Sequence, residues 1–427
     1  MHGHGSSTAV FEDENHGKSP YRWVMLGLAC FLYASFSMVN ASLTPLVKPV
    51  SSELGLSGTQ MGSVFGAWPF IYLFVALPAG GLIDKWGLKP SLLLGMGFIG
   101  LSQMLRVIAW DYPSMLIAVA VFGIGGPFVS VGCPKLTTLW FSQKDLPVAM
   151  GIYTCAPSLG NIFAVSTANS VIMPLTGDSW RTTLAFYGGI VLVSALTWLV
   201  FARTSSAEIA QRASKEPQAS VQETFGKLIR MPLVQIVLVM SVCTFMIGHG
   251  YGNWLPEVLR RGGMTPAEAG FWASLPTFVG ILGALTLPRF ITPERQAPML
   301  TALFAAQLAS ALLVGFTQGL PLYLGLVLAG VGRGVTNPLL VLFLARSPQV
   351  GPRNMGVAGG MYFTAGEIGG VTGPVVVGML ADAMGGFQGG LIFIAGICAL
   401  LIALTFVLRF IATNTRAAEA AAQPVAT

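Results

Sequence analysis

The sequence predicts an all-α polytopic membrane protein, with twelve transmembrane helices in two pseudo-symmetric six-helix bundles. The first reason is composition: 54% of the 427 residues are hydrophobic and only 9% are charged, so a soluble globule could not cover the apolar surface. The second is that the apolar residues fall into twelve runs, each long enough to cross about 30 Å of hydrocarbon. The third is a motif that occurs once in each half of the chain.

The expected spans fall into two groups of six, separated by the one long polar stretch inside the chain. The spans of the first group are 22–47, 59–82, 91–110, 114–140, 147–174 and 182–201. Those of the second group are 232–259, 266–288, 296–316, 321–345, 354–380 and 388–410.

The predicted domain boundaries follow from these spans. Residues 21–202 form the N-terminal bundle, 203–230 a cytoplasmic linker and 231–412 the C-terminal bundle. Residues 1–20 lack apolar periodicity, and we expect a disordered cytoplasmic tail; its histidines could bind a metal weakly, but a solvated tail is the favoured interpretation and we predict no metal site. Residues 413–427, which are rich in alanine, form a second cytoplasmic tail. The five cysteines lie in apolar runs without a CxxC pair, which is typical of core residues.

The basic residues predict the orientation in the membrane. If the N-terminus is cytoplasmic, most of the 23 lysines and arginines fall on the inner side, whereas Lys48, Arg106 and Arg181 are among the few on the outer side. This is the distribution that the positive-inside rule requires. We therefore expect a multi-pass protein of the bacterial inner membrane with both termini in the cytoplasm.

The repeated motif supports two related halves. Gly55-Leu-Ser-Gly-Thr-Gln-Met-Gly62 recurs as Gly263-Met-Thr-Pro-Ala-Glu-Ala-Gly270, ahead of the second and the eighth span. Ser57 and Thr265 stand where an N-cap is expected, with glutamine or glutamate three residues later as in a capping box. The match indicates either common descent of the halves or the same helix-capping residues arising independently in each half.

A charged loop motif lies between the second and third spans. Its residues are Gly80, Asp84, Lys85, Gly87 and Lys89. It resembles the loop between helices 2 and 3 of the major facilitator superfamily, although Pro90 replaces a base that is common there. The resemblance implies a secondary transporter that works by alternating access. It also implies that Asp84 acts at a cytoplasmic gate, near the start of the eleventh helix, where the helix dipole favours a carboxylate.

Three charged residues are expected inside the membrane: Lys135, Arg333 and Glu367. A charge in hydrocarbon costs about 2.5–3.5 kcal/mol, so each needs a partner or a water-filled cavity. The resemblance puts all three on helices that line a central cavity. Arg333 and Glu367 could instead form a structural ion pair, and Lys135 could extend to the headgroups.

Four polar residues on two further spans are weaker candidates. Tyr33 and Asn40 share one face of the first span, and His249 and Asn253 are an i, i+4 pair on the seventh. These spans correspond to each other in the resembled fold, which favours a substrate site between the halves. Hydrogen bonding between helices is the alternative for each residue. His249 is also a candidate for proton transfer.

Two buried bases against one acid predict a binding site that prefers a small anion, and a carboxylate is the expected class. Glu367 is the expected proton-coupling residue, so we expect symport of a monoanion with a proton. In general style the chain resembles the bacterial monocarboxylate, oxalate and cyanate porters. One alternative is a proton-coupled antiporter of a neutral or cationic solute, such as a drug or a metal. Another is a receptor or scaffold that does not transport.

The expected partners are a small-molecule substrate, protons and the lipid bilayer. No HExxH or GxSxG signature is present, and we predict neither an enzyme nor a cofactor. The scattered bases do not form a nucleic-acid footprint. We expect a monomer.

Overall fold

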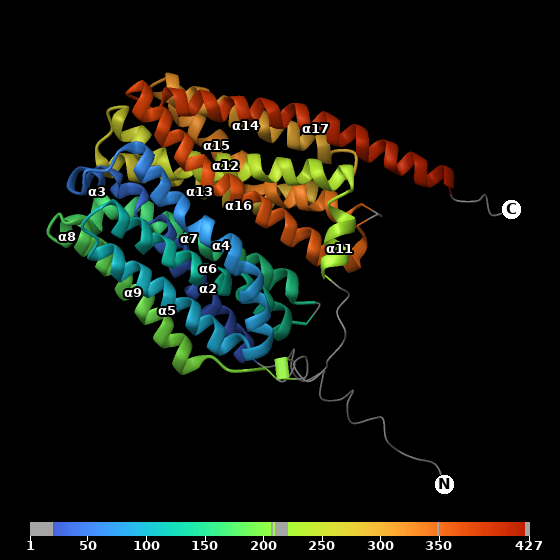
Figure 1. Ribbon diagram of the computed structural model, residues 1–427, viewed down its shortest axis with the longest axis horizontal. Coiled ribbons are helices and arrows are strands. Elements are labelled where there is room, and N and C mark those ends of the chain that lie inside the picture. Colours follow the sequence, from blue (N-terminus) through green and yellow to red (C-terminus); the bar gives the residue numbers. More distant parts are fainter. Residues whose placement is uncertain (1–19, 143, 206–207, 210–220, 348–349, 423–427) are drawn as a thin grey trace, which may run out of the picture. The chain divides into compact units, whose positions relative to one another are not determined.

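The computed structural model describes residues 20–142, 144–205, 208–209, 221–347 and 350–422, and within these ranges every regular element is a helix (Figure 1). Twelve stretches within these described ranges are long and apolar enough to cross a membrane, which confirms the predicted number. The elements of the first half are α2 (Tyr21–Ala41), η1 (Thr44–Leu46), α3 (Val47–Leu54), α4 (Gly58–Trp86), α5 (Leu88–Val107), α6 (Tyr112–Trp140), α7 (Leu146–Thr167), η2 (Ala168–Ile172), α8 (Met173–Leu175) and α9 (Trp180–Phe201). The later elements are α11 (Val221–Leu228), α12 (Pro232–Arg261), α13 (Pro266–Thr286), η3 (Leu287–Phe290), α14 (Gln296–Phe316), α15 (Leu320–Ala345), α16 (Gly351–Met384) and α17 (Gln388–Ala422).

The chain divides into two compact units. Unit 1 comprises Met1–Gly55, Phe70–Pro217 and Pro266–Phe271, and unit 2 comprises Leu56–Pro69, Gln218–Thr265 and Trp272–Thr427. Within unit 1, α2 packs along α7 and α5 lies between α6 and α9. Within unit 2, α12 packs along α16, and α14 lies between α15 and α17 (Figure 1). The start of α4 therefore belongs to unit 2 and its remainder to unit 1.

The first predicted span, 22–47, is not one continuous helix. Helix α2 ends at Ala41, and a 3₁₀ turn, η1, leads into α3. Pro45 and Pro49 lack the N–H that would continue the helical hydrogen bonds, which accounts for the interruption. Gly55 then ends α3 with a φ of 65°, a conformation that glycine adopts without strain.

The start of α4 confirms the capping box predicted at Ser57. The backbone N–H of Ser57 donates to Gln60 Oε1 (3.0 Å), and the N–H of Gln60 donates to Ser57 Oγ (3.2 Å). Asp382 of α16 accepts hydrogen bonds from the N–H groups of Gly58 and Thr59, both at 2.7 Å. These groups are among the first-turn donors that have no partner within the helix itself.

Other boundaries differ modestly from those expected. The fifth span contains a π-helical turn, η2, and the eighth ends in the 3₁₀ turn η3. The last helix continues to Ala422, through most of the segment predicted as a tail. Within the predicted linker, 203–230, the described residues are 203–205, 208–209 and 221–230, and the last stretch includes α11. The predicted disordered tail lies outside the described residues except for Pro20.

Arg106, which the sequence analysis placed on the outer side, is buried one residue before the end of α5. Its side chain is only 1% exposed, and Nη1 donates to the carbonyl of Val39 (2.9 Å) and lies 3.3 Å from Ser42 Oγ. The guanidinium also lies 5.5 Å from the centre of the Phe122 ring. The break after α2 leaves carbonyls without helical partners, and Arg106 is long enough to reach them from α5.

Candidate functional site

Arg333 projects from α15 toward α12. Its Nη2 donates to the carbonyl of Gly248 at 2.6 Å. A side chain on Gly252, one turn further along α12, would collide with the same nitrogen, so the glycine at position 252 leaves room for the guanidinium. Among the described residues no carboxylate forms an ion pair with Arg333, and this hydrogen bond occupies only one of its five donors.

Glu367 lies on α16 where that helix packs against α12. The residue is 6% exposed, and Oε2 has no hydrogen-bond partner within the described part of the chain. Oε2 lies 2.6 Å, and His249 Nδ1 3.3 Å, from the point where a side chain on Gly370 would begin. The absence of a side chain at Gly370 therefore lets an acid and an imidazole face the same small space.

His249 is held between two aromatic rings of unit 2. Its ring stacks on Trp68 of α4 at 5.4 Å between centroids and on Phe245 of α12 at 6.0 Å. Asn253, one turn after His249, is half-buried and has no hydrogen bond to another described residue. The i, i+4 pair thus lies on the helix that also carries the Gly248 carbonyl, and it belongs to the same unit as Arg333 and Glu367.

The two candidates on the first span belong to unit 1. Tyr33 stacks nearly parallel on Tyr153 of α7, with centroids 6.0 Å apart. Asn40 is half-buried one residue before the end of α2, and it makes no hydrogen bond to another described residue. Its amide is therefore free to bind a polar ligand.

Lys135 and Asp84 had been assigned to different sites, and the structure pairs them. Lys135 Nζ of α6 donates to Asp84 Oδ1 near the end of α4. The Asp84 side chain is 63% exposed and that of Lys135 20%, so the pair lies at the surface of unit 1. Such a pair contributes modestly to stability. Its existence gives Lys135 a partner other than a substrate anion.

The rest of the loop motif fixes the turn between α4 and α5. Gly87 adopts a φ of 92°, which a residue with a side chain rarely adopts. Lys89 Nζ donates to the carbonyl of Ala202 after α9 (2.8 Å). Gly80 has open space where a side chain would stand, and Lys85 is exposed.

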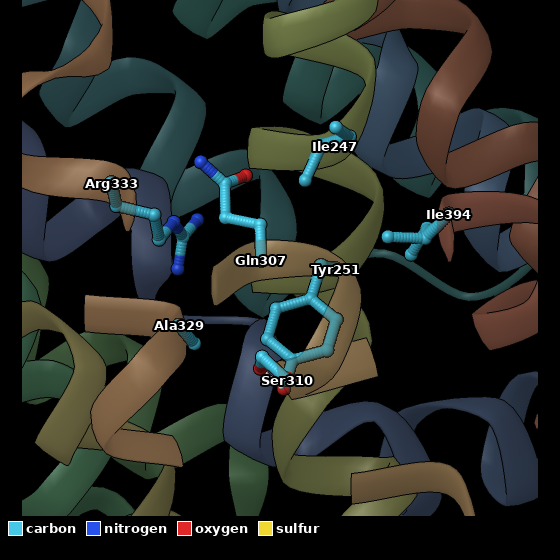
Figure 2. Close-up of a pocket in the computed structure, with 7 residues that line it drawn as sticks. All are labelled: Ile247, Tyr251, Gln307, Ser310, Ala329, Arg333 and Ile394. Carbon is cyan, nitrogen blue, oxygen red and sulfur yellow. Dashed lines mark hydrogen bonds between the residues drawn. The ribbon is translucent and has the colours of Figure 1, made fainter. Parts of the chain in front are cut away.

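Two features of unit 2 were missed by the sequence analysis. Trp68 covers one face of His249, and a small pocket beside Arg333 contains Gln307 (Figure 2). The pocket residues come from four helices, and no single helix shows a pattern that would reveal it. The chemistry of the site is that of a fixed positive charge with a separate buried acid.

Comparison with known proteins gives a consistent result. The model of the Major Facilitator Superfamily matches residues 29–374. The probable galactarate/D-glucarate transporter GudP of Bacillus subtilis is 24% identical over 92% of each chain. The hexuronate transporter of the same organism is 23% identical, over 90% of this chain and 93% of its own.

Among solved structures, a mutant of the nucleoside transporter NupG aligns with a TM-score of 0.75. The alignment covers 89% of this chain and 98% of that one, at 15% sequence identity. This likeness confirms the predicted helical fold. The proteins matched are described as transporters, which agrees with the prediction that the chain is not an enzyme.

Proposed function

This chain belongs to the major facilitator superfamily, and from that premise we propose that it carries a small carboxylate across the bacterial inner membrane by alternating access, coupled to protons. The observation that carries the proposal is Arg333. Its guanidinium is half-buried within a predicted span, and no acid among the described residues neutralises it. A buried cation is costly unless an anion compensates it, and a carboxylate matches the planar fork of arginine.

The relatives support this substrate class. Galactarate, D-glucarate and hexuronates, after which the two Bacillus subtilis proteins are named, all carry carboxylates. The chain aligns with almost the whole of each relative, so the comparison extends to both halves.

The test is uptake into liposomes that contain the purified protein, with carboxylates, inorganic anions and organic cations offered separately. Arg333→Ala should raise the KM for carboxylates more than about 30-fold, since losing a buried charged partner costs at least about 2 kcal/mol. Arg333→Lys should fall between, because it keeps the charge and loses the paired hydrogen bonds. Arg346→Ala is the matched control: it removes an arginine that follows the same helix and donates to Gln296 (2.8 Å). Wild-type affinity in Arg333→Ala would contradict the proposal.

The coupling role falls to Glu367. A buried carboxylate without a partner is more stable when protonated than when charged, so Glu367 is suited to carry a proton through the cycle. The antiporter alternative would be favoured by Lys135 at the headgroups and a permanent pair between Arg333 and Glu367, and these last two residues make no such contact in the described structure. Failure of every solute in the uptake panel would favour the scaffold alternative.

We also propose that both termini are cytoplasmic and that the protein functions as a monomer. The distribution of basic residues supports the orientation. Labelling of a cysteine introduced near Trp110, in the loop before α6, by a membrane-impermeant reagent in intact cells would test it. Light scattering of the detergent complex would test the oligomeric state.

A further inference from the structure

A small pocket of unit 2 lies beside Arg333. Residues of α12, α14, α15 and α17 line it (Figure 2). Its lining residues are Ile247, Tyr251, Gln307, Ser310, Ala329, Arg333 and Ile394. The space available, about 10 Å³ for the centre of a water-sized molecule, accommodates one water or one group of that size.

The Gln307 amide is the unusual feature of this pocket. The residue is only 8% exposed, and its amide has no hydrogen bond to any described residue. Two other buried glutamines do have partners: Gln296 Nε2 donates to the carbonyl of Leu339 (2.9 Å) and its Oε1 accepts from Arg346 (2.8 Å), and Gln103 Nε2 donates to the carbonyl of Leu184 (2.9 Å), although Gln103 Oε1 has no partner among the described residues. A buried amide without a partner is destabilising, so Gln307 points to a polar group that enters the pocket.

The remaining polar groups define what that ligand can be. Tyr251 and Ser310 hold each other through their hydroxyls at 3.2 Å, and Arg333 contributes N–H donors with no carboxylate nearby among the described residues. Ile247, Ala329 and Ile394 form the apolar remainder. The lining offers both donors and acceptors for a single neutral group, which is the chemistry of a hydroxyl.

We propose that this pocket binds the hydroxyl of a 2-hydroxycarboxylate whose carboxylate is bound by Arg333. This inference rests on the proposed function and narrows its substrate class. The guanidinium of Arg333 lines the pocket and would also bind the carboxylate. A substrate group that enters the pocket must therefore lie within a bond or two of that carboxylate. A hydroxyl on the neighbouring carbon meets this requirement, and Gln307 supplies its partner. An unsubstituted carboxylate leaves the amide unpaired.

The test compares acids that differ only in the 2-hydroxyl: lactate with propionate, malate with succinate, and gluconate with 2-deoxygluconate. In liposomes, the wild type should transport the hydroxy member of a pair with a KM about 10-fold lower or better. Gln307→Met should abolish this preference, so that the two members of a pair have equal KM values. Methionine keeps the unbranched stem that packs against Gly332. Ser310→Ala, which removes the partner of Tyr251, should weaken the preference without abolishing transport.

The matched control is Gln103→Met, which removes a buried glutamine of unit 1 and should keep the wild-type preference. Equal transport of both members by the wild type would overturn this inference, would leave the proposed function standing and would assign the pocket to a structural water. Equal loss of transport of both acids of a pair in Gln307→Met would overturn the inference as well. If the wild type transports no carboxylate, the proposed function itself fails.

Discussion

Replacing Glu367 with glutamine should uncouple substrate movement from the pH gradient while leaving exchange intact. Three acids are buried among the described residues, and two of them have partners. Glu257 binds Arg260 at 2.7 Å and Arg261 at 3.2 Å, and Glu208 accepts from the N–H of Leu88 at 2.8 Å. Glu367 is the third, and its Oε2 has none within the described part. It is therefore the acid best suited to bind and release a proton.

If Glu367 carries the proton as proposed, one proton accompanies each monoanion and the transport step is electrically neutral. At equilibrium the substrate ratio across the membrane then equals the proton ratio, about tenfold for each pH unit, or about 1.4 kcal/mol. Proton binding should raise anion affinity by the same factor by which the anion raises proton affinity. Glutamine resembles the protonated acid, so Glu367→Gln should bind and exchange substrate without a proton cycle.

The assay is uptake of the best-transported carboxylate into liposomes with an imposed pH difference of one unit, with protein-free liposomes as the measure of leak. Wild-type protein should accumulate substrate about tenfold. Glu367→Gln should equilibrate labelled substrate at a ratio of one and still support counterflow. Glu257→Gln is the control, because that acid already has two basic partners, and it should retain accumulation. If Glu367→Gln still concentrates substrate as the wild type does, Glu367 is not the coupling residue and His249 is the next to test.

Two further predictions concern gating and packing. Asp84→Asn should weaken its contact with Lys135 and bias the protein toward the inward-open state, seen as greater cytoplasmic labelling of single cysteines along the transport path; unchanged labelling on both sides would refute the gate assignment. Gly369→Ala should destabilise by about 1–3 kcal/mol, because the added methyl overlaps the carbonyl of Val242. Gly359→Ala on the same helix has open space and should be neutral or stabilising by up to about 1 kcal/mol. Thermal unfolding in detergent compares the two, and a similar shift for both would contradict the packing argument.

Much of the fold was predictable because the membrane imposes span length on the sequence. The twelve spans follow from apolar runs, and the capping box of Ser57 and Gln60 follows from local spacing. Pro45 and Pro49 indicate the interruption of the first span at Thr44–Leu46. The apolar run continues through this region, so hydropathy alone does not show the break.

The site was less predictable because its contacts join residues far apart in the chain. The span positions identified Arg333 and Glu367 as buried charges, but they did not reveal that no ion pair joins them. Sequence spacing placed Arg106 near the end of a span, where a base is usually exposed, and only the fold shows which carbonyls it reaches. Gln307 and Gln103 are both single glutamines within apolar spans, so the sequence does not distinguish them. Whether the Gln307 amide has a partner depends on the packing of the four helices that line the pocket.

The contact between Arg106 and the end of α2 has an electrostatic consequence for the first span. The last carbonyls of a helix carry a partial negative charge of about half an electron, which repels an anion. Asn40 stands in that last turn, and Arg106 places a positive charge against the adjacent Val39 carbonyl. The positive charge of Arg106 offsets this partial charge beside Asn40, which would favour a carboxylate there if Asn40 belongs to the proposed site. The break in the first span would in this way contribute to binding of an anion. We expect Arg106→Gln to lower the affinity for carboxylates without loss of folding.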